Sequence, residues 1–246
     1  MFTKMWYNNN IESFGGEGIM KIIARIRTDF PDKFGIPRQS GLLSSLEARI
    51  VFEPEYRVPE AIRGLEDWSH LWLIWQFSEA VRENWSPTVR PPRLGGNKRV
   101  GVFATRSPFR PNPIGLSSVR LLRIEKTENE GCVLVVSGAD MMDGTPIYDI
   151  KPYLPYSDVH TDASGGFAEE VFGEKLSVDF PYALLSRLPE NKREAVKAIL
   201  TEDPRPAVRA KDSDRVFGFG FAGFEIKFTV SDGVATVVSV ESCERG

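Results

Sequence analysis

The chain has few of the residues that build metal sites and disulfides. Its 246 residues include two cysteines and two histidines, and no spacing among Cys132, Cys243, His70 and His160 is typical of a zinc site. We therefore expect no structural metal. So little cysteine fits a protein of the reducing cytoplasm.

Long apolar runs are also missing. No segment approaches the roughly 18–20 apolar residues that cross a bilayer, and the N-terminus lacks the pattern of a secretory signal. The apolar fraction of 41% and the charged fraction of 26% are near the averages for globular proteins. The sequence thus predicts a soluble cytoplasmic protein with a sizeable core and no membrane partner.

Three familiar catalytic signatures do not occur in the sequence. There is no Gly-x-Gly-x-x-Gly after a strand, no P-loop and no Gly-x-Ser-x-Gly elbow. Their absence argues against the doubly wound nucleotide-binding folds and the common hydrolases. A functional site would then be built from irregular loops that a rigid sheet positions.

Acidic residues are absent from one long stretch. No Asp or Glu occurs between Asn84 and Ile124, although the stretch holds eight basic residues and the whole chain has a net charge of −3. Such a local basic patch suits a polyanion that docks at one place, and neutralisation by acids from elsewhere in the fold is the alternative. The candidate phosphate contacts are Arg90, Arg93, Lys98, Arg99 and Arg110.

Short β-like runs separated by proline and glycine dominate the first two thirds of the chain. Many short strands at modest spacing predict a mainly β protein whose N-terminal domain is a β-barrel. The run Leu71 to Trp75 is apolar enough for a buried helix, yet its length and aromatic content favour a strand. The expected strands are residues 21–27, 47–52, 70–77, 100–104, 117–124, 132–137 and 147–151.

The composition divides the chain into four parts. Residues 1–19 resemble a dispensable leader, 20–155 the barrel domain, 156–174 a linker or loop, and 175–246 a small α+β C-terminal domain. In this last part we expect a helix over 189–200 and strands over 217–230 and 234–240. The turn Ser231-Asp232-Gly233 would join the two strands as a hairpin.

Four loops combine polar residues with glycine and proline: residues 35–41, 64–71, 90–116 and 139–153. Taken alone, a loop of this composition more often only shapes a turn than forms a functional site. A single histidine such as His70 is likewise more often a hydrogen-bonded residue of the core. The third loop is different because its prolines stiffen the segment that carries Arg106 and Arg110. A stiff loop loses little entropy when it holds arginines ready for an anion.

The loops also contain motifs that occur together in one known family. The motifs are Pro37-Arg38-Gln39 and residues 63–66, 69–71, 88–96, 101–107, 109–115, 143–146 and 149–153. In this order they resemble the TrmO (TsaA-like) family over residues 20–155. Residues 200–207 resemble that family's small C-terminal domain.

The resemblance implies a β-barrel methyltransferase that is dimeric and binds S-adenosylmethionine near the subunit interface. Its substrate would be tRNA bearing N6-threonylcarbamoyladenosine next to the anticodon, and it would transfer the methyl group to N6. The cofactor site would be lined by Pro37, Arg38, Gln39, His70, Leu71, Arg106, Leu116, Asp143, Gly144, Thr145 and Pro146.

The chemistry leaves several points open. Because the N6 lone pair is delocalised into the ring and the carbamoyl group, a base that removes the N6 proton would help, and Asp143, Asp140 and His70 are candidates. Phe109 or Tyr153 could stack on the modified base. The rival readings are a non-catalytic RNA-binding β-barrel and a protein that only senses S-adenosylmethionine.

Overall fold

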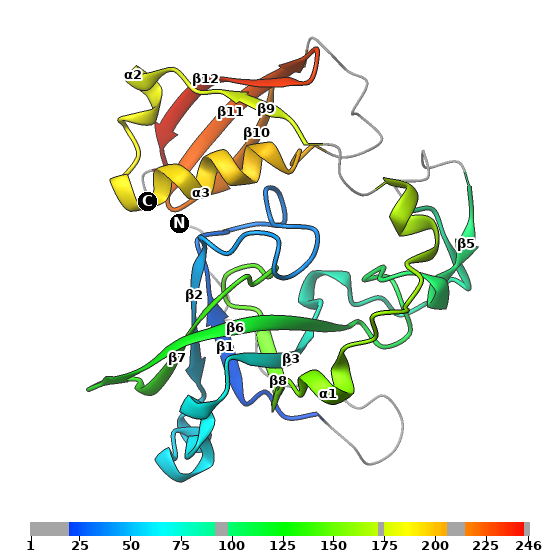
Figure 1. Ribbon diagram of the computed structural model, residues 1–246, viewed down its shortest axis with the longest axis vertical. Helices are drawn as coiled ribbons and strands as arrows, with labels where there is room; N and C mark the ends of the chain where they lie inside the picture. Colours follow the sequence, from blue (N-terminus) through cyan, green and yellow to red (C-terminus); the bar gives the residue numbers. More distant parts are fainter. Residues whose placement is uncertain (1–19, 92–97, 172–174, 206–214, 244–246) are drawn as a thin grey trace, which may run out of the picture.

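The computed structural model describes residues 20–91, 98–171, 175–205 and 215–243 (Figure 1). The expected leader, residues 1–19, and the candidate Arg93 lie outside these residues. The fold is mainly β, as the sequence predicts, and its two larger sheets have six and four strands. Figure 1 shows the sheet of the C-terminal part above the strands of the N-terminal part, with α3 beside the upper sheet.

Six antiparallel strands of the N-terminal part close on themselves in the order β1-β2-β7-β6-β3-β8, which is a closed barrel. Closure comes from β8, which pairs with β1 through Ala24 opposite Ile147. The bounds are β1 Ala24–Arg27, β2 Glu47–Phe52, β3 His70–Gln76, β6 Ile114–Thr127, β7 Gly131–Ser137 and β8 Pro146–Pro152.

Alternation within the strands decides which side chains fill the barrel. In β3 every second residue, Leu71, Leu73 and Trp75, is buried, as the period of two in a strand requires. The Leu71–Trp75 run is therefore a strand and not a helix. Ile26, Ile50, Leu134 and Ile147 contribute from the other strands to the same apolar core.

The second sheet has the order β10-β11-β12-β9, with β9 parallel to β12. The residues Ala195, Val196, Ile199 and Leu200 lie on one face of α3 and are buried in the same apolar cluster as this sheet. The bounds are β9 Ser177–Asp179, α2 Tyr182–Leu185, α3 Glu190–Thr201, β10 Phe217–Phe221, β11 Phe224–Ser231 and β12 Val234–Ser242.

The segment between β1 and β2 belongs to both parts of the molecule. Its side chains Phe30, Leu43 and Leu46 are buried in the apolar cluster of the second sheet. Gly35, at φ +82°, lies so close to Phe219 that a Cβ there would be 2.7 Å from a ring atom. The loop that carries Pro37, Arg38 and Gln39 is thus packed against the C-terminal sheet.

Short elements account for the differences from the expected strands. The expected strand 100–104 is wrong beyond Gly101, where strand β5 (Val100–Gly101) ends. A 3-10 turn over 102–104 follows, and Thr105 donates from its backbone N–H to the Val102 carbonyl. The expected strand 217–230 is two strands, because Ala222 and Gly223 adopt positive φ at a turn. Segment 156–174 contains helical turns.

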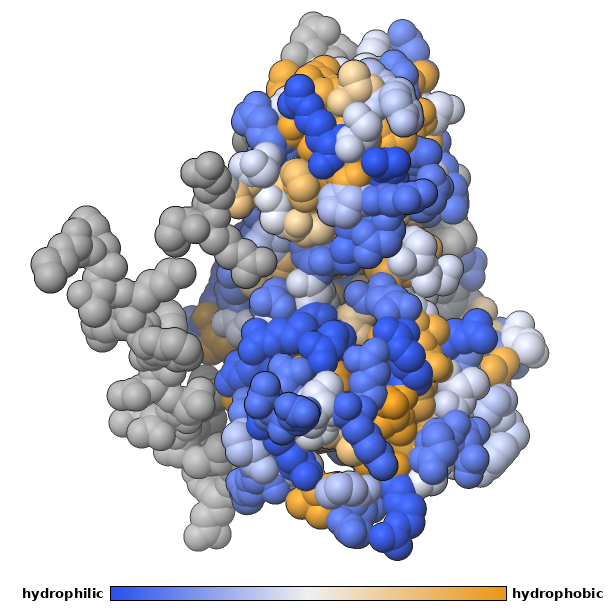
Figure 2. All heavy atoms as spheres, turned by 90° about the vertical axis from the view of Figure 1, so that its left-hand side faces the viewer, coloured by the Kyte–Doolittle hydropathy of each residue, from blue (hydrophilic) through white to orange (hydrophobic). Residues whose placement is uncertain are grey.

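The remaining elements are short. They are 3-10 turns Pro54–Tyr56, Pro59–Ile62, Leu65–Asp67, Ser78–Ala80, Val102–Ala104 and Gly166–Val171, strands β4 Thr88–Val89 and β5 Val100–Gly101, and helix α1 Pro155–Asp158. Across the described chain no helix is long and apolar enough to cross a membrane. Figure 2 shows a face on which hydrophilic side chains prevail over the lower part of the molecule.

Candidate functional site

Two adjoining cavities open beside the loops that precede β2 and β6. The smaller has a volume of about 680 Å³ and the larger about 1330 Å³. The two cavities share part of their lining. Residues of the shared lining include Lys33, Pro37, Arg38, Gln39, Arg106, Phe109 and Arg110.

The smaller cavity holds much of the expected cofactor site. Of the candidate residues, those that line it are Pro37, Arg38, Gln39, Arg106, Leu116 and Thr145, and the candidate base Asp140 lines it as well. Trp75 and Phe77 add an aromatic wall, with ring centroids 4.2 Å apart. The cavity thus combines apolar and aromatic surface with three arginines and the half-buried carboxyl of Asp140, a composition typical of small-molecule sites.

Asp140 is a half-buried carboxyl of the smaller cavity. Its Oδ1 accepts a hydrogen bond of 2.6 Å from the hydroxyl of Ser117. Burial raises the pKa of Asp140, while the Ser117 hydroxyl and the charge of Arg106 act in the opposite direction. A carboxyl whose proton affinity is raised inside a cavity is a candidate for proton transfer.

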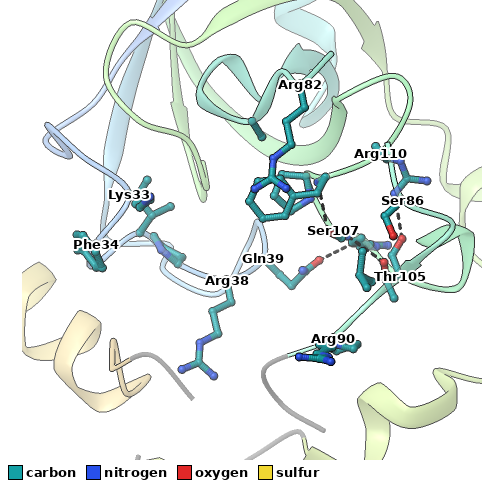
Figure 3. Close-up of a pocket in the computed structure, with 18 of the residues that line it drawn as sticks. Lys33, Phe34, Arg38, Gln39, Arg82, Ser86, Arg90, Thr105, Ser107 and Arg110 are labelled. Carbon is teal, nitrogen blue, oxygen red and sulfur yellow. Dashed lines mark hydrogen bonds between the residues drawn. The ribbon is translucent and has the colours of Figure 1, made fainter. Parts of the chain in front are cut away.

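The side chains of Arg106 and Arg38 form hydrogen bonds with different parts of the chain. Arg106 donates from Nη1 to Gln39 Oε1 at 2.5 Å, which joins the loop before β6 to the loop before β2. Arg38 instead donates from Nη2 to the carbonyl oxygens of Asp203 and Arg205, at 2.8 and 3.0 Å. Figure 3 shows Gln39 turned toward the segment of Thr105 and Ser107, and Arg38 turned away from it.

The other candidate cofactor residues lie elsewhere on the barrel. His70 accepts or donates a hydrogen bond at Nδ1 with the Ser69 hydroxyl at 2.9 Å, and the Leu71 side chain is fully buried in the barrel core. Asp143 Oδ1 accepts from the backbone N–H of Thr28 at 3.1 Å. Gly144 and Pro146 pair with β1. The described lining of the two cavities contains none of these five residues: His70, Leu71, Asp143, Gly144 and Pro146.

Four basic residues of the acid-free stretch line the larger cavity: Arg90, Arg99, Arg106 and Arg110. Lys98, next to Arg99 in the sequence, is exposed. Arg99 donates to the Thr88 hydroxyl at 2.8 Å and Arg110 to the Thr105 carbonyl at 3.0 Å, so neither contact neutralises the charge. Among the described residues of the stretch, the ion pairs with carboxylates involve Arg123 alone.

Sequence reasoning did not single out several residues of the site. The Arg82 guanidinium lies 3.8 Å from the centroid of the Phe109 ring, and Trp85 and Phe103 form a second exposed aromatic pair. Ser117 was not a candidate either, since nothing local marks a serine inside an apolar strand. The other stacking candidate, Tyr153, packs against Trp72 at a centroid distance of 5.4 Å.

The fold and the site together define a class of protein. A closed barrel carries a small-molecule cavity with a half-buried carboxyl at one side and an arginine-rich surface beside it, which fits a protein that brings a small ligand to a polyanion. The family model of the tRNA-methyltransferase O N-terminal domain matches residues 25–159, and that of the TrmO C-terminal domain matches residues 173–243. The chain belongs to the TrmO family.

Curated relatives and solved structures agree with this assignment. The chain is 37% identical over 226 residues to the tRNA (adenine(37)-N6)-methyltransferase of Escherichia coli, covering 89% of this chain and 96% of that protein. A protein of the same name from Eikenella corrodens is 41% identical, covering 72% of this chain and 98% of its own length. The crystal structure of TrmO from Pseudomonas aeruginosa superposes with a TM-score of 0.72 at 30% identity, covering 92% of this chain and all of that one.

Proposed function

We propose that this protein is an S-adenosylmethionine-dependent tRNA (adenine-N6)-methyltransferase that acts on N6-threonylcarbamoyladenosine next to the anticodon. Membership of the TrmO family supports the reaction type, since the relatives are named tRNA (adenine(37)-N6)-methyltransferases. The observation that carries the proposal for the site is the cavity that contains Asp140 beside Arg106 and Gln39.

The residues of the smaller cavity fit the cofactor. Arg106 and Gln39 offer donors for a carboxylate, and the aromatic rings of Trp75 and Phe77 offer apolar surface for a purine. The negative charge of Asp140 suits a cavity that receives a cationic group. When bound there, S-adenosylmethionine would supply the methyl group. The chain's own task is then to orient the two substrates and to exclude water.

A proton must leave N6 when the nitrogen is methylated. Of the three candidate bases, Asp140 alone lines a described cavity, whereas His70 contacts Ser69 and Asp143 contacts the backbone of Thr28. Asp140 is therefore our proposed proton acceptor. Its partly desolvated carboxylate binds a proton more readily than an exposed one.

The larger cavity is the proposed docking place of the anticodon loop. Arg90, Arg99 and Arg110 would contact phosphates, and Phe109, 41% exposed, would stack on an unpaired base. We further propose a homodimer with the cofactor near its interface. A tRNA substrate would place the enzyme in the cytoplasm.

One assay separates this proposal from its rivals. Purified protein should transfer a labelled methyl group from S-adenosylmethionine to tRNA that carries N6-threonylcarbamoyladenosine, with mass spectrometry identifying N6-methylation. Asp140→Asn should lose at least 100-fold in kcat while it still binds the cofactor. Binding of tRNA without any cofactor binding would instead support the RNA-binding barrel, and cofactor binding without transfer would support the sensor.

A further inference from the structure

A chain of two hydrogen bonds runs through the barrel interior and ends at Asp140. Trp75 Nε1 donates to Ser117 Oγ at 2.9 Å, and Ser117 Oγ donates to Asp140 Oδ1 at 2.6 Å. Ser117 is fully buried and Trp75 is 6% exposed. These three residues come from β3, β6 and the segment after β7, so three separate parts of the chain build the arrangement.

The direction of the two bonds follows from elementary chemistry. An indole N–H is a donor only, so the oxygen of Ser117 must accept from Trp75. The single hydroxyl hydrogen of Ser117 remains to point at Asp140, where a carboxylate can only accept. A bond of 2.6 Å falls in the range of O–H···O⁻ bonds to an ionised acceptor.

The register of the barrel holds the indole in place. Gly115 lies directly opposite Trp75 in the β3–β6 pair, and a Cβ at Gly115 would come within 2.2 Å of the indole ring. The ring therefore lies across β6 in space that only a glycine leaves open. Ser117 is two residues further along β6 and points to the same side of the sheet.

We propose that Ser117, oriented by Trp75, is a positioning residue that fixes the Asp140 carboxylate as the proton acceptor of methyl transfer. This inference rests on the proposed function, because it concerns the same reaction. In the step, the N6–H bond breaks, its electron pair forms the bond from N6 to the methyl carbon, and the proton moves to an Asp140 oxygen. The electron pair of the broken sulfur–methyl bond would stay on the sulfur of the cofactor, which would leave as the neutral thioether. Asp140 afterwards gives the proton to water.

Several charged side chains line the cavity that contains Asp140. Burial raises the pKa of Asp140, whereas the Ser117 hydroxyl, the backbone amides of Asp140 and Ser40, and the charge of Arg106 lower it. The charged residues that line the same cavity are Lys33, Arg38, Glu79, Arg106 and Arg110. Because the Ser117 hydroxyl stabilises the ionised form, its removal raises the pKa of Asp140. The active form is the carboxylate, so activity then appears only at higher pH.

The test compares Ser117→Ala and Trp75→Phe with Ser118→Ala, a neighbouring serine on the same strand. The protonation of Asp140 is followed without cofactor or tRNA by carboxyl ¹³C NMR, and kcat is measured against pH. We call Ser117→Ala and Trp75→Phe the relay variants, and we expect the pKa of Asp140 to be raised in both. The acidic limb of the kcat profile should then move to higher pH, and kcat at pH values below that limb should fall about tenfold. At alkaline pH kcat should recover to within about threefold, and Ser118→Ala should match the wild type.

Two results would overturn the inference. One is an unchanged Asp140 titration in both relay variants, and Trp75→Phe provides this test if Ser117→Ala does not fold. The other is a shifted titration with an unshifted kcat profile, because Asp140 would then not be the proton acceptor. A wild-type protein that does not methylate tRNA would refute the proposed function. The titration without ligands would still decide whether Ser117 and Trp75 change the pKa of Asp140.

Discussion

Arg106 lies in the wall that the two cavities share, and its described polar contact is the hydrogen bond to Gln39. Both side chains are exposed, so neither supports the core. Their donors instead converge on the smaller cavity from two loops that are far apart in the sequence. This arrangement is suited to a ligand carboxylate, which accepts two donors at once.

We predict that Arg106→Ala weakens binding of S-adenosylmethionine and leaves the fold intact. Loss of a charge-assisted hydrogen bond typically costs about 1.5–3 kcal/mol, which corresponds to a ten- to hundredfold loss of affinity. Isothermal titration at fixed salt measures the effect, and a thermal melting curve checks the fold. Arg120→Ala, an exposed arginine of β6, is the matched control. An unchanged Kd with a normal melting curve would contradict the assignment.

At the scale of elements, most of the described cations in the segment from β4 to β6 have no carboxylate partner. Arg90, Lys98, Arg99 and Arg110 have no carboxylate partner among the described residues, whereas Arg123 pairs with Glu47 and Glu125 at 3.0 and 2.8 Å. The alternative of an internally neutralised surface therefore holds for Arg123 and not for the others. Only unpaired cations release counterions from a bound polyanion in full.

This contrast predicts how single variants respond to salt. Lys98→Ala should lower the slope of log affinity for tRNA against log salt by about 0.7–0.9, because one phosphate contact is lost. Arg123→Ala removes the same charge from the same stretch but should leave the slope within about 0.2, since its guanidinium is already paired. Filter binding between low and moderate salt measures both. Equal slopes in all three proteins would mean that tRNA docks elsewhere.

At the scale of the whole molecule, the segment between β1 and β2 joins the barrel to the apolar core of the second sheet. Phe30, Leu43 and Leu46 enter the cluster of the second sheet, and Gly35 lies against Phe219. The bonds from Arg38 to the carbonyls of Asp203 and Arg205 add a polar tie. The loop before β2 thus connects the smaller cavity to the C-terminal part.

We predict that this connection makes the two parts unfold together. All five tryptophans precede residue 86, so tryptophan fluorescence reports on the N-terminal part. Phe219→Ala should cost about 3–5 kcal/mol and lower the fluorescence midpoint together with the circular dichroism midpoint. Val238→Ala, at an exposed position of β12, should change neither by more than about 0.5 kcal/mol. The coupling would be refuted if Phe219→Ala left the fluorescence midpoint unchanged and showed an additional transition at lower temperature by circular dichroism.

The sequence predicted those elements whose pattern is local. Strand β2 has the expected bounds, β3 and α3 lie within two residues of the expected ones, and the hairpin at Ser231-Asp232-Gly233 is present. Each depends on alternation, helical spacing or a turn that neighbouring residues decide. The expected strands over 100–104 and 217–230 were wrong in part, because the 3-10 turn at Val102 and the break at Ala222-Gly223 depend on local hydrogen bonds and positive φ.

The sequence by itself determined the mainly β fold, the family motifs and the basic stretch, since composition and spacing are properties of the chain. Only the tertiary structure decided which of these residues meet. Thr145 lines the smaller cavity, whereas Asp143, two residues earlier, contacts Thr28, and Ser117 becomes the partner of Asp140. The reason is that the strand order of the barrel brings together residues that are far apart in the sequence, such as Ser117 and Asp140, 23 positions apart, and Trp75 and Ser117, 42 positions apart. A buried hydroxyl among apolar neighbours gains its role from that pairing.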